Sequence, residues 1–270
     1  MDEDVLLVEN LPVEGSSPAG GVISVWTLNR PEKLNGYTPT MATQLVDAMT
    51  ELDTNDELWV GVLFAHGDHF TAGLDLPKWT DRMSSNDRSH TDQSSRVDPM
   101  ALGRASRKPI ITAVKGITYT FGIELALAGD IIIAADNCRF SQLEPARGIH
   151  ATGGATIRFV ERGGWGNAMY HLLTCDEFDA EEAYRIGLVQ EIVPAGSELT
   201  RALDLAARIC EMAPLAVQET KASSKRWIDE GFKATVNAMG SVQSKLLASD
   251  DAKEGVASFV ERRSAQFKGR

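Results

Sequence analysis

The chain has 270 residues, of which 43% are hydrophobic and 24% are charged, which is ample apolar material for a globular core. Its net charge of −11 argues against a general nucleic-acid binder or an anionic-membrane binder, because both need a positive field. An acidic amino end and short apolar runs predict a cytoplasmic protein that does not enter a membrane. The three cysteines, Cys138, Cys175 and Cys210, form no CxxC pair, so no disulfide framework or metal site is expected.

The first half of the chain alternates strand-like and helix-like segments. Apolar residues recur at helical spacing over Thr40–Leu52, which predicts a helix. The segment PVEGSSPAGG is rich in turn residues, and Asn29–Gly36 is expected to be a loop. The polar stretch Thr80–Arg96 has too little apolar content to pack and predicts a mobile surface loop. Strands are expected at Val5–Glu9, Gly21–Asn29 and Trp59–Ala65.

The second half begins with strands and ends in helices. Helix Gly122–Ala128 is expected between strands Ile110–Val114 and Ile131–Ala134, and short strands alternating with helices predict an α/β layer architecture. After Ala151 the pattern becomes helical. We expect an α/β core over 1–195 and a helical C-terminal region over 196–270. The predicted later elements are helix Asp179–Ile186, strand Leu188–Val193, and helices Ser197–Met212, Pro214–Glu230, Phe232–Ala248 and Asp250–Gln266.

Two carboxylates are candidates for proton chemistry. Glu124 is the single charge in an otherwise apolar helix, and burying an unpaired carboxylate costs several kcal/mol. It is therefore paired, exposed at a cleft, or retained for a raised pKa, although a solvated helix face or a buried ion pair would explain it equally well. Glu144 follows a strand-like piece and precedes Pro145, a place where catalytic groups often lie. Taken alone, Glu144 is better explained as an acid on a surface loop or as a partner of Arg147.

The stretch Phe70-Thr-Ala-Gly-Leu-Asp-Leu76 is a candidate for binding an anion through backbone amides. Leu74 and Asp75 are expected to begin a helix, and amides at a helix start have no intrahelical acceptor. Phe121 also lies at an expected helix start. Two such amides converging on one oxygen would stabilise a thioester enolate. Each stretch alone is a weak signal.

Together, these stretches resemble the enoyl-CoA hydratase/isomerase (crotonase) family over nearly the whole chain. The resemblance implies a crotonase-like spiral core of ββα units followed by the helical C-terminal region. The matching stretches are LNRPEKLNGYT at Leu28–Thr38, HFTAGLDL at His69–Leu76, VKGITYTFGIELALAGDIIIAA at Val114–Ala135, FSQLEPARGIHATGGATIR at Phe140–Arg158, AEEAYRIGLVQEIVP at Ala180–Pro194 and FVERRSAQFKGR at Phe259–Arg270.

The resemblance also implies an activity, the hydration of 2-enoyl-CoA to 3-hydroxyacyl-CoA. By motif match, the amides of Leu74 and Phe121 would hold the thioester carbonyl. Glu144 would exchange the proton at Cα, and Glu124 would activate the water that attacks Cβ. The substrate carries its own coenzyme A, so no further cofactor is expected.

Other residues are assigned to substrate binding and assembly by the same resemblance. Relatives bind CoA at positions that match Lys33, Leu34, Asn35 and Ala72, and on a neighbouring subunit at positions that match Phe259 and Arg262. Relatives also form trimers or hexamers, so a homotrimer or homohexamer is expected. The positions beside these motifs that we assign to substrate binding are Gly73, Asp75, Leu76 and Gly122.

The chain departs from its relatives at two places. Thr120-Phe121-Gly122 stands where many have consecutive glycines, and His150-Ala-Thr-Gly-Gly-Ala155 replaces a common Ile-Pro-Gly-Ala-Gly-Gly. These changes keep both glutamates but leave the acyl group open. Isomerase, thioester hydrolase or decarboxylase chemistry on the same site, and a non-catalytic CoA-binding homologue, are the alternatives. His66 and His69 are interpreted as a turn pair rather than as metal ligands. His150 could line the pocket, although an ordinary loop histidine is the favoured interpretation.

Overall fold

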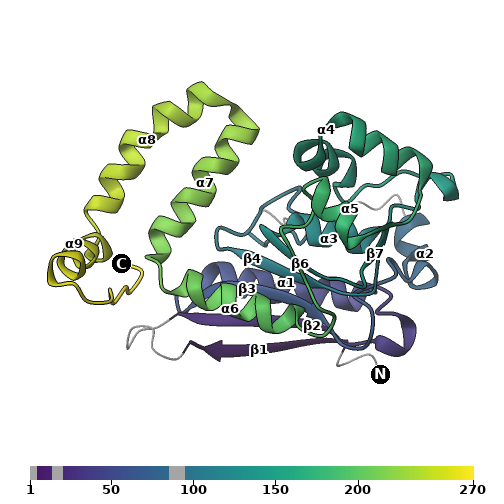
Figure 1. Cartoon of the computed structure of the whole chain (residues 1–270), viewed down its shortest axis with the longest axis horizontal. Helices are drawn as coiled ribbons and strands as arrows, with labels where there is room; N and C mark the ends of the chain where they lie inside the picture. Colours follow the sequence, from purple (N-terminus) through teal and green to yellow (C-terminus); the bar gives the residue numbers. More distant parts are fainter. Residues whose placement is uncertain (1–4, 14–20, 85–94) are drawn as a thin grey trace.

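The protein is described by a computed structural model over residues 5–13, 21–84 and 95–270. Its centre is a six-stranded sheet in the order β1-β2-β3-β4-β6-β9, in which β1 is antiparallel to β2 and the other neighbours are parallel (Figure 1). These strands are β1 Leu6–Pro12, β2 Val22–Leu28, β3 Leu58–Ala65, β4 Ile110–Val114, β6 Ile131–Ala135 and β9 Glu191–Val193.

A second, three-stranded sheet has the order β5-β7-β8. Its strands are β5 Ile117–Tyr119, β7 Arg139–Ser141 and β8 Phe178–Asp179. The helices are α1 Pro39–Thr54, α2 Leu76–Ser84, α3 Phe121–Ala128, α4 Ala155–Thr174, α5 Ala180–Arg185, α6 Glu198–Cys210, α7 Pro214–Glu230, α8 Phe232–Leu247 and α9 Asp250–Glu261, with 3-10 turns at Pro31–Lys33 and Pro145–Arg147.

The chain repeats a strand–strand–helix unit that alternates between the two sheets. Strand β4 leads directly into β5 and then α3, and β6 leads into β7 and then α4. Two isolated parallel bridges, Tyr37 with Leu74 and Thr71 with Thr118, continue the second layer toward the amino end. The predicted α/β architecture with ββα units is thus present, and each turn of the spiral delivers a loop to the same region of the molecule.

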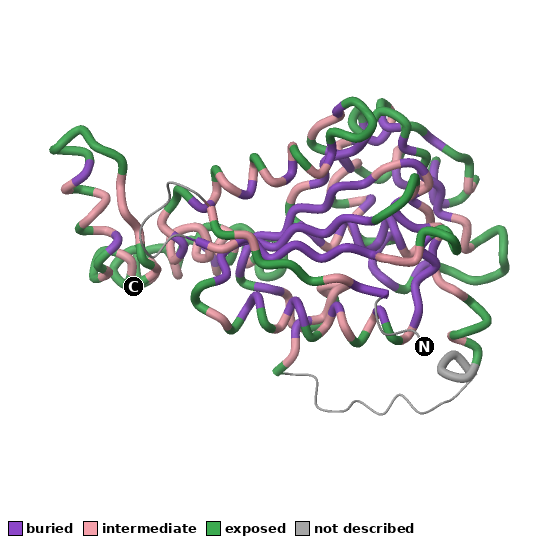
Figure 2. The backbone as a smooth tube through the Cα atoms, turned by 90° about the horizontal axis from the view of Figure 1, so that it is seen from below, coloured by how far each residue is buried: buried purple, intermediate pink, exposed green. Residues whose placement is uncertain are grey.

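The central strands β2, β3, β4 and β6 of the large sheet are buried on both faces, as their continuous apolar sequences require, whereas the edge strand β1 is largely exposed. All eight residues of β3 are buried. One face packs against α6, through Ala202, Ala206 and Cys210, and the other faces α1 and α3. Figure 2 shows the buried backbone concentrated in these strands, whereas the end of the molecule that carries α7, α8 and α9 is mostly exposed or intermediate.

Helices α7, α8 and α9 extend away from the sheets as an arm (Figure 1). Their buried residues are few: Pro214 in α7, Thr235 in α8, and Asp251 and Ser258 in α9. Helix α6 covers the large sheet, so helical sequence after residue 196 serves both the core and the arm. The division of the chain at 195 and 196 stays a prediction.

Several expected boundaries differ from the structure. Helix α2 continues to Ser84, so the first part of the stretch predicted as a loop from Thr80 to Arg96 is helical, and residues 85–94 lie outside the described residues. The last helix ends at Glu261 rather than Gln266. Residues 14–20 of the predicted turn segment also lie outside the described ranges. Strands β5, β7 and β8 are only two or three residues long, which is too short for a recognisable periodicity.

Candidate active site

One cavity of about 810 Å³ contains both candidate glutamates. Its walls come from the segment before α2, from α2 and α3, and from the loop that joins β7 to α4. The lining is mostly apolar around the two carboxylates, as is common for small-molecule sites. The lining residues are Ala72, Leu74, Leu76, Trp79, Met100, Thr120, Phe121, Glu124, Leu143, Glu144, Arg147, Ile149, His150, Thr152 and Gly153.

Glu124 is held at the amino end of α4. It is 3% exposed, and its Oε1 accepts hydrogen bonds from the amides of Gly153 at 2.7 Å and Ala155 at 3.1 Å. Burial raises the pKa of Glu124 and the nearby Glu144 raises it further, whereas the two amides and Arg158 oppose the rise. The two hydrogen bonds from backbone amides and the dipole of helix α4 both favour the ionised form of Glu124. Of the alternatives expected for Glu124, the structure shows hydrogen-bonded partners and a raised pKa, whereas the side chain lines the cavity without being exposed.

Glu144 has a different environment. It begins the 3-10 turn Pro145–Arg147, and its backbone carbonyl accepts hydrogen bonds from the amides of Arg147 and Ile149. Its side-chain Oε2 is buried and has no hydrogen-bond partner among the described residues. Burial raises the pKa of Glu144, whereas its own backbone amide, the Gln142 side chain and the nearby His150 oppose part of that rise. The predicted alternative, a surface acid paired with Arg147, is not what the structure shows.

The two environments assign the charge of the glutamate pair. Two carboxylates that line the same cavity disfavour each other's ionisation, and Glu144 raises the pKa of Glu124. Glu124 has two backbone donors on Oε1, while Oε2 of Glu144 has none in the described chain. This difference favours Glu124 as the carboxylate and Glu144 as the carrier of the shared proton. Such a pair provides one acid and one base side by side.

Leu74 and Phe121 follow two segments that pair with each other, and both residues line the cavity. Thr71 pairs in parallel with Thr118, and counting three residues on from each reaches Leu74 and Phe121. Within the described chain neither amide donates to a protein acceptor. Both residues line the cavity. Their N–H groups are therefore available to an oxygen atom of a ligand.

The Leu74 amide is free for a reason that the sequence did not predict. Helix α2 begins at Leu76, so Leu74 lies before the helix and not at its start. Leu74 instead forms the parallel bridge with Tyr37, in which Gly73 O accepts from the Tyr37 amide and the Asp75 amide donates to Tyr37 O. Such a bridge uses the groups of the flanking residues. The amide of Leu74 itself therefore has no acceptor in the bridge. Phe121, in contrast, is the first residue of α3, as predicted.

Close packing around Gly73 holds these two amides in place. Gly73 has φ +104, and a methyl group there would lie 2.1 Å from Thr120 Oγ1. Thr120 has φ 49, an unfavourable backbone conformation for a residue other than glycine. Its amide donates to Ser141 O at 2.9 Å, which fixes the residue before Phe121. Only a residue without a Cβ atom fits at position 73.

The bulky side chain of Phe121 belongs to an aromatic wall of the cavity. Its ring lies 4.4 Å from the buried ring of Tyr37, which stacks at 6.5 Å on Trp79. Trp79 Nε1 donates to Tyr37 O at 2.7 Å. The Phe121 side chain therefore lies against other aromatic rings and leaves its amide accessible.

Most of the other predicted binding residues support the site without lining it. The Asn35 side chain is buried and accepts from the Arg30 amide while donating to the carbonyls of His66 and His69. Asp75 forms an ion pair with Arg30 at 2.7 Å. Gly122 packs against Thr71. Of the remaining predicted residues, Ala72 and Leu76 line the cavity, and Lys33 and Leu34 are exposed beside it, with Leu34 O accepting from the Ala72 amide at 3.0 Å.

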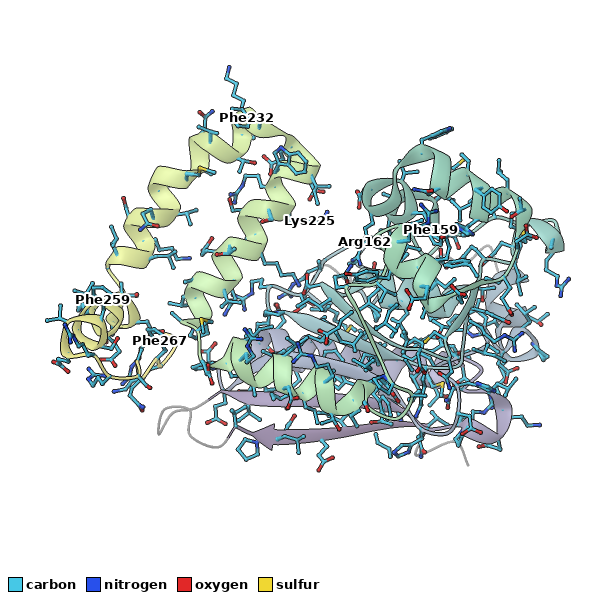
Figure 3. All side chains as sticks on the ribbon, viewed as in Figure 1. Phe159, Arg162, Lys225, Phe232, Phe259 and Phe267 are labelled. Carbon is cyan, nitrogen blue, oxygen red and sulfur yellow. The ribbon has the colours of Figure 1, made fainter. Side chains whose placement is uncertain are left out.

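Phe259 and Arg262 do not reach this cavity. They lie on the arm, Phe259 in α9 and Arg262 just after it, and Figure 3 shows Phe259 far from the sheets. The Phe259 side chain is 85% exposed. The structure of one chain therefore leaves both residues apart from the glutamates, and their predicted role needs a second subunit.

Some residues in the cavity or next to it have no counterpart among the predicted site residues. Trp79 and Met100 flank the stretch that was expected to be an unstructured loop, so its composition hid them. Arg158 lies within the motif FSQLEPARGIHATGGATIR, but no single-residue signal distinguishes it. His150, expected to be an ordinary loop histidine, is a wall residue whose Nδ1 lies 3.1 Å from Ala151 O.

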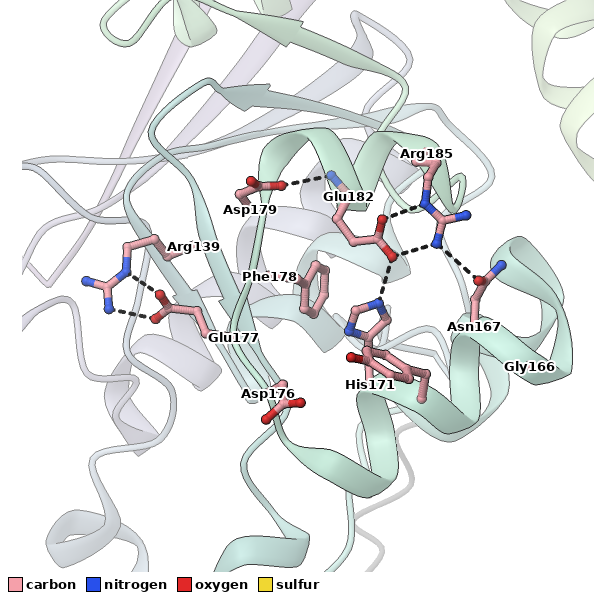
Figure 4. A pocket seen from close by; sticks show the side chains of 11 residues that line it. Arg139, Gly166, Asn167, His171, Asp176, Glu177, Phe178, Asp179, Glu182 and Arg185 are labelled. Atoms are coloured by element: carbon pink, nitrogen blue, oxygen red, sulfur yellow. Dashed lines mark hydrogen bonds and ion pairs between the residues drawn. The ribbon is translucent and has the colours of Figure 1, made fainter.

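A wider cavity of about 970 Å³ lies elsewhere, between α4, α5 and β8 (Figure 4). Two of its four acids form ion pairs, Glu177 with Arg139 at 2.6 Å, and Glu182 with Arg185 at 2.5 Å and with His171. A third, Asp179, accepts from the Glu182 amide at 2.9 Å. None of the predicted site residues line it. Within the described ranges no three His, Cys, Asp or Glu side chains gather as a metal site, and no helix is long and apolar enough to cross a bilayer. The cavity with the two glutamates is therefore the candidate active site.

Comparison with known proteins gives a consistent picture. The family model "Enoyl-CoA hydratase/isomerase" matches residues 18–270. The crystal structure of a "probable enoyl-CoA hydratase/isomerase" from Mycobacterium abscessus superposes with a TM-score of 0.90, at 40% identity over 99% of both chains. The enoyl-CoA hydratase EchA19 of Mycobacterium tuberculosis is 33% identical over 90% of this chain and 92% of its own length. The crotonyl-CoA hydratase of Syntrophomonas wolfei is 31% identical over 91% and 94%, respectively.

Proposed function

This chain belongs to the enoyl-CoA hydratase/isomerase family, and from that membership and its paired cavity glutamates we infer that it is an enoyl-CoA hydratase. It adds water reversibly to a 2-enoyl-CoA thioester and forms a 3-hydroxyacyl-CoA. The observation that supports hydration most directly is the difference between the two carboxylates. One is hydrogen-bonded by backbone amides and the other is buried without a partner among the described residues.

We propose that the two glutamates divide the proton transfers. Glu124, as the carboxylate, takes a proton from water while the water oxygen forms a bond to Cβ. The π electrons of the double bond move toward the thioester and generate an enolate. Glu144 then donates its proton to Cα, and the two carboxyl groups exchange a proton before the next turnover. Acid and base catalysis by positioned groups typically contributes about 10²–10⁴-fold each.

The enolate oxygen is assigned to the amides of Leu74 and Phe121. Both N–H groups are unused by the described protein and line the cavity that holds the glutamates. Fixed backbone dipoles need no reorganisation when charge develops on the oxygen. The exposed segment of Lys33 and Leu34, beside Ala72, is the proposed location of the CoA moiety.

The direct test is the loss of enoyl-thioester absorbance when the protein is mixed with crotonyl-CoA. Hydration predicts 3-hydroxybutyryl-CoA as the product, and Glu124→Gln and Glu144→Gln are the matched variants. A shifted double bond, free CoA or released carbon dioxide instead would identify isomerase, hydrolase or decarboxylase chemistry. Turnover of none of the acyl-CoAs, despite CoA binding, would favour a non-catalytic homologue.

The pH dependence of kcat/KM should be bell-shaped. Glu124 must be ionised, so activity falls as the pH drops through the lower apparent pKa of the pair. Glu144 must be protonated, so activity falls again as the pH rises through the upper one. Burial raises both pKa values, so the acid limb should lie above the ordinary glutamate pKa of 4.5. A rate profile from pH 4 to 10 on crotonyl-CoA tests this. A flat acid side down to pH 4.5 would contradict it.

We further propose that the enzyme needs no cofactor beyond the CoA of its substrate and that it works in the cytoplasm. The three cysteines are all free, which suits a reducing compartment. The proposed chemistry uses only carboxylates and backbone amides. Full activity after exhaustive dialysis against a chelator would support the first proposal.

We expect a homotrimer or homohexamer assembled through the arm. The arm exposes many large apolar side chains, and large exposed apolar patches mark interaction surfaces. Light scattering should give three or six times the chain mass of 29.3 kDa, and Phe232→Asp should lower that mass without unfolding the core. A wild-type monomer at micromolar concentration would overturn the expectation. The exposed apolar side chains of the arm are Trp227, Ile228, Phe232, Val236, Met239, Leu247, Val256, Phe259 and Val260.

A further inference from the structure

We propose that Met100 is the residue that limits acyl-chain length. Short 2-enoyl groups fit this site, and the Met100 side chain closes a second cavity behind it to longer acyl chains. The inference rests on the proposed function, because the oxyanion amides and the glutamates define how the thioester lies. It adds a substrate class to that function and assigns the limit to one side chain.

The direction of the acyl chain follows from the catalytic groups. With the carbonyl oxygen at the Leu74 and Phe121 amides and Cβ at Glu124, further carbons must extend beyond Glu124. A methyl group on Gly153 would lie 2.5 Å from Glu124 Oε2 and 3.1 Å from Met100 Sδ. The sulfur and the carboxylate therefore flank the same narrow space. The first carbons beyond Cβ meet the Met100 side chain.

The backbone that carries Met100 is fixed at both edges. The Asp98 carboxylate accepts from the amides of Met100 and Leu102, each at 2.9 Å, and from that of Gly103 at 2.8 Å. From the other side, Arg158 Nη2 donates to the carbonyl of Met100 at 2.6 Å and of the following residue at 3.2 Å. These charge-assisted bonds prevent the segment from sliding away when a longer chain presses on it.

Arg158 also connects this segment to the base. Its Nη1 donates to Gly153 O at 3.1 Å, and the Gly153 amide is a donor to Glu124. The Arg158 guanidinium thus fixes the position of the Met100 segment relative to the Glu124 carboxylate. A long acyl group could displace the wall only by disturbing Glu124.

A second cavity of about 490 Å³ lies directly behind this wall. Ala101 lines it and is the neighbour of Met100, and Leu125 lines it and is the neighbour of Glu124. At two places, adjacent residues of the chain line different cavities. The apolar part of the second cavity is formed by Leu63, Val97, Leu102, Leu125, Leu127 and Ile157.

Removing the Met100 side chain should join the two cavities. A buried methylene contributes about fourfold in affinity, so a chain that enters the second cavity should bind progressively more tightly. Leu is close to Met in volume, so Met100→Leu keeps the wall. Leu102→Trp fills the second cavity from a half-exposed position and provides the opposite control.

The experiment measures dissociation constants for saturated acyl-CoAs from butyryl to dodecanoyl by calorimetry. We expect the wild type, Met100→Leu and Leu102→Trp to gain no affinity beyond the chain length that reaches Met100. Met100→Ala should bind decanoyl-CoA at least about tenfold more tightly than the wild type, and Leu102→Trp in that background should cancel the gain.

Two results would overturn the proposal. One is a Met100→Ala series that parallels the wild type, and the other is wild-type affinity that keeps rising through decanoyl-CoA. Because the ligands are saturated, the measurement needs no turnover. Hydration of crotonyl-CoA by the same preparations tests the proposed function separately, so failure of one conclusion is distinguishable from failure of the other.

Discussion

Glu144→Gln should reduce hydration of crotonyl-CoA by at least about 100-fold, the usual scale of a lost general acid. Glutamine keeps the shape of the side chain but has no acidic proton to give to Cα. Incorporation of solvent deuterium at Cα should fall with the hydration rate, and both are measured with purified variants. Near-normal turnover would remove Glu144 from the role of acid.

Protein stability separates this loss from a folding defect. Glu144 Oε2 is buried without a partner in the described chain, and burial raises its pKa. A group whose pKa is raised on folding weakens the folded state as the pH rises through that pKa. The neutral amide avoids this cost, so the thermal midpoint of Glu144→Gln at neutral pH should equal or exceed that of the wild type. A lower midpoint would point to misfolding.

Gly73→Ala should reduce kcat by about 10²–10³-fold, the scale seen when an oxyanion donor is lost. The new methyl group would lie 2.1 Å from Thr120 Oγ1, so the two loops that present Leu74 and Phe121 must separate. Neither amide would then reach the thioester oxygen in the right geometry. Steady-state kinetics with crotonyl-CoA test the expected loss.

Gly196→Ala is the matched control for Gly73→Ala. Gly196 also has a positive φ, +91 compared with +104, but a methyl group there meets nothing within 4 Å. Both substitutions carry the backbone cost of about 1–2 kcal/mol, and only the first creates the clash. Gly196→Ala should retain full kcat, and Thr120→Ala should restore part of the activity of Gly73→Ala by removing the clashing hydroxyl. Full activity of Gly73→Ala would contradict the oxyanion assignment.

The sequence allowed most of the large elements to be predicted, because their apolar patterns are long enough to read. The strands Trp59–Ala65 and Ile110–Val114 and the helices after Pro214 lie close to where the pattern placed them. The second sheet was missed because its pairing is non-local: Ile117 pairs with Arg139, and Arg139 with Asp179. Three-residue strands acquire their identity from partners distant in sequence.

The candidate catalytic residues were proposed by motif match, but their hydrogen-bond environments could not be predicted from the sequence. The sequence around Glu124 does not indicate that the amides of Gly153 and Ala155 donate to its carboxylate. The Leu74 amide was assigned correctly to the cavity for an incorrect reason, since a bridge to Tyr37 and not a helix start leaves it unused. Arg158 and Met100 matter only through contacts that the fold creates.

The arm formed by α7, α8 and α9 has a thermodynamic consequence beyond assembly. These helices bury few of their own side chains, so the intact fold of one chain adds little to their resistance to local unfolding. Their order then depends by mass action on whatever covers their apolar side chains. Dilution should therefore loosen the arm long before the sheets, so amide exchange in this region would report protein concentration while the core would not.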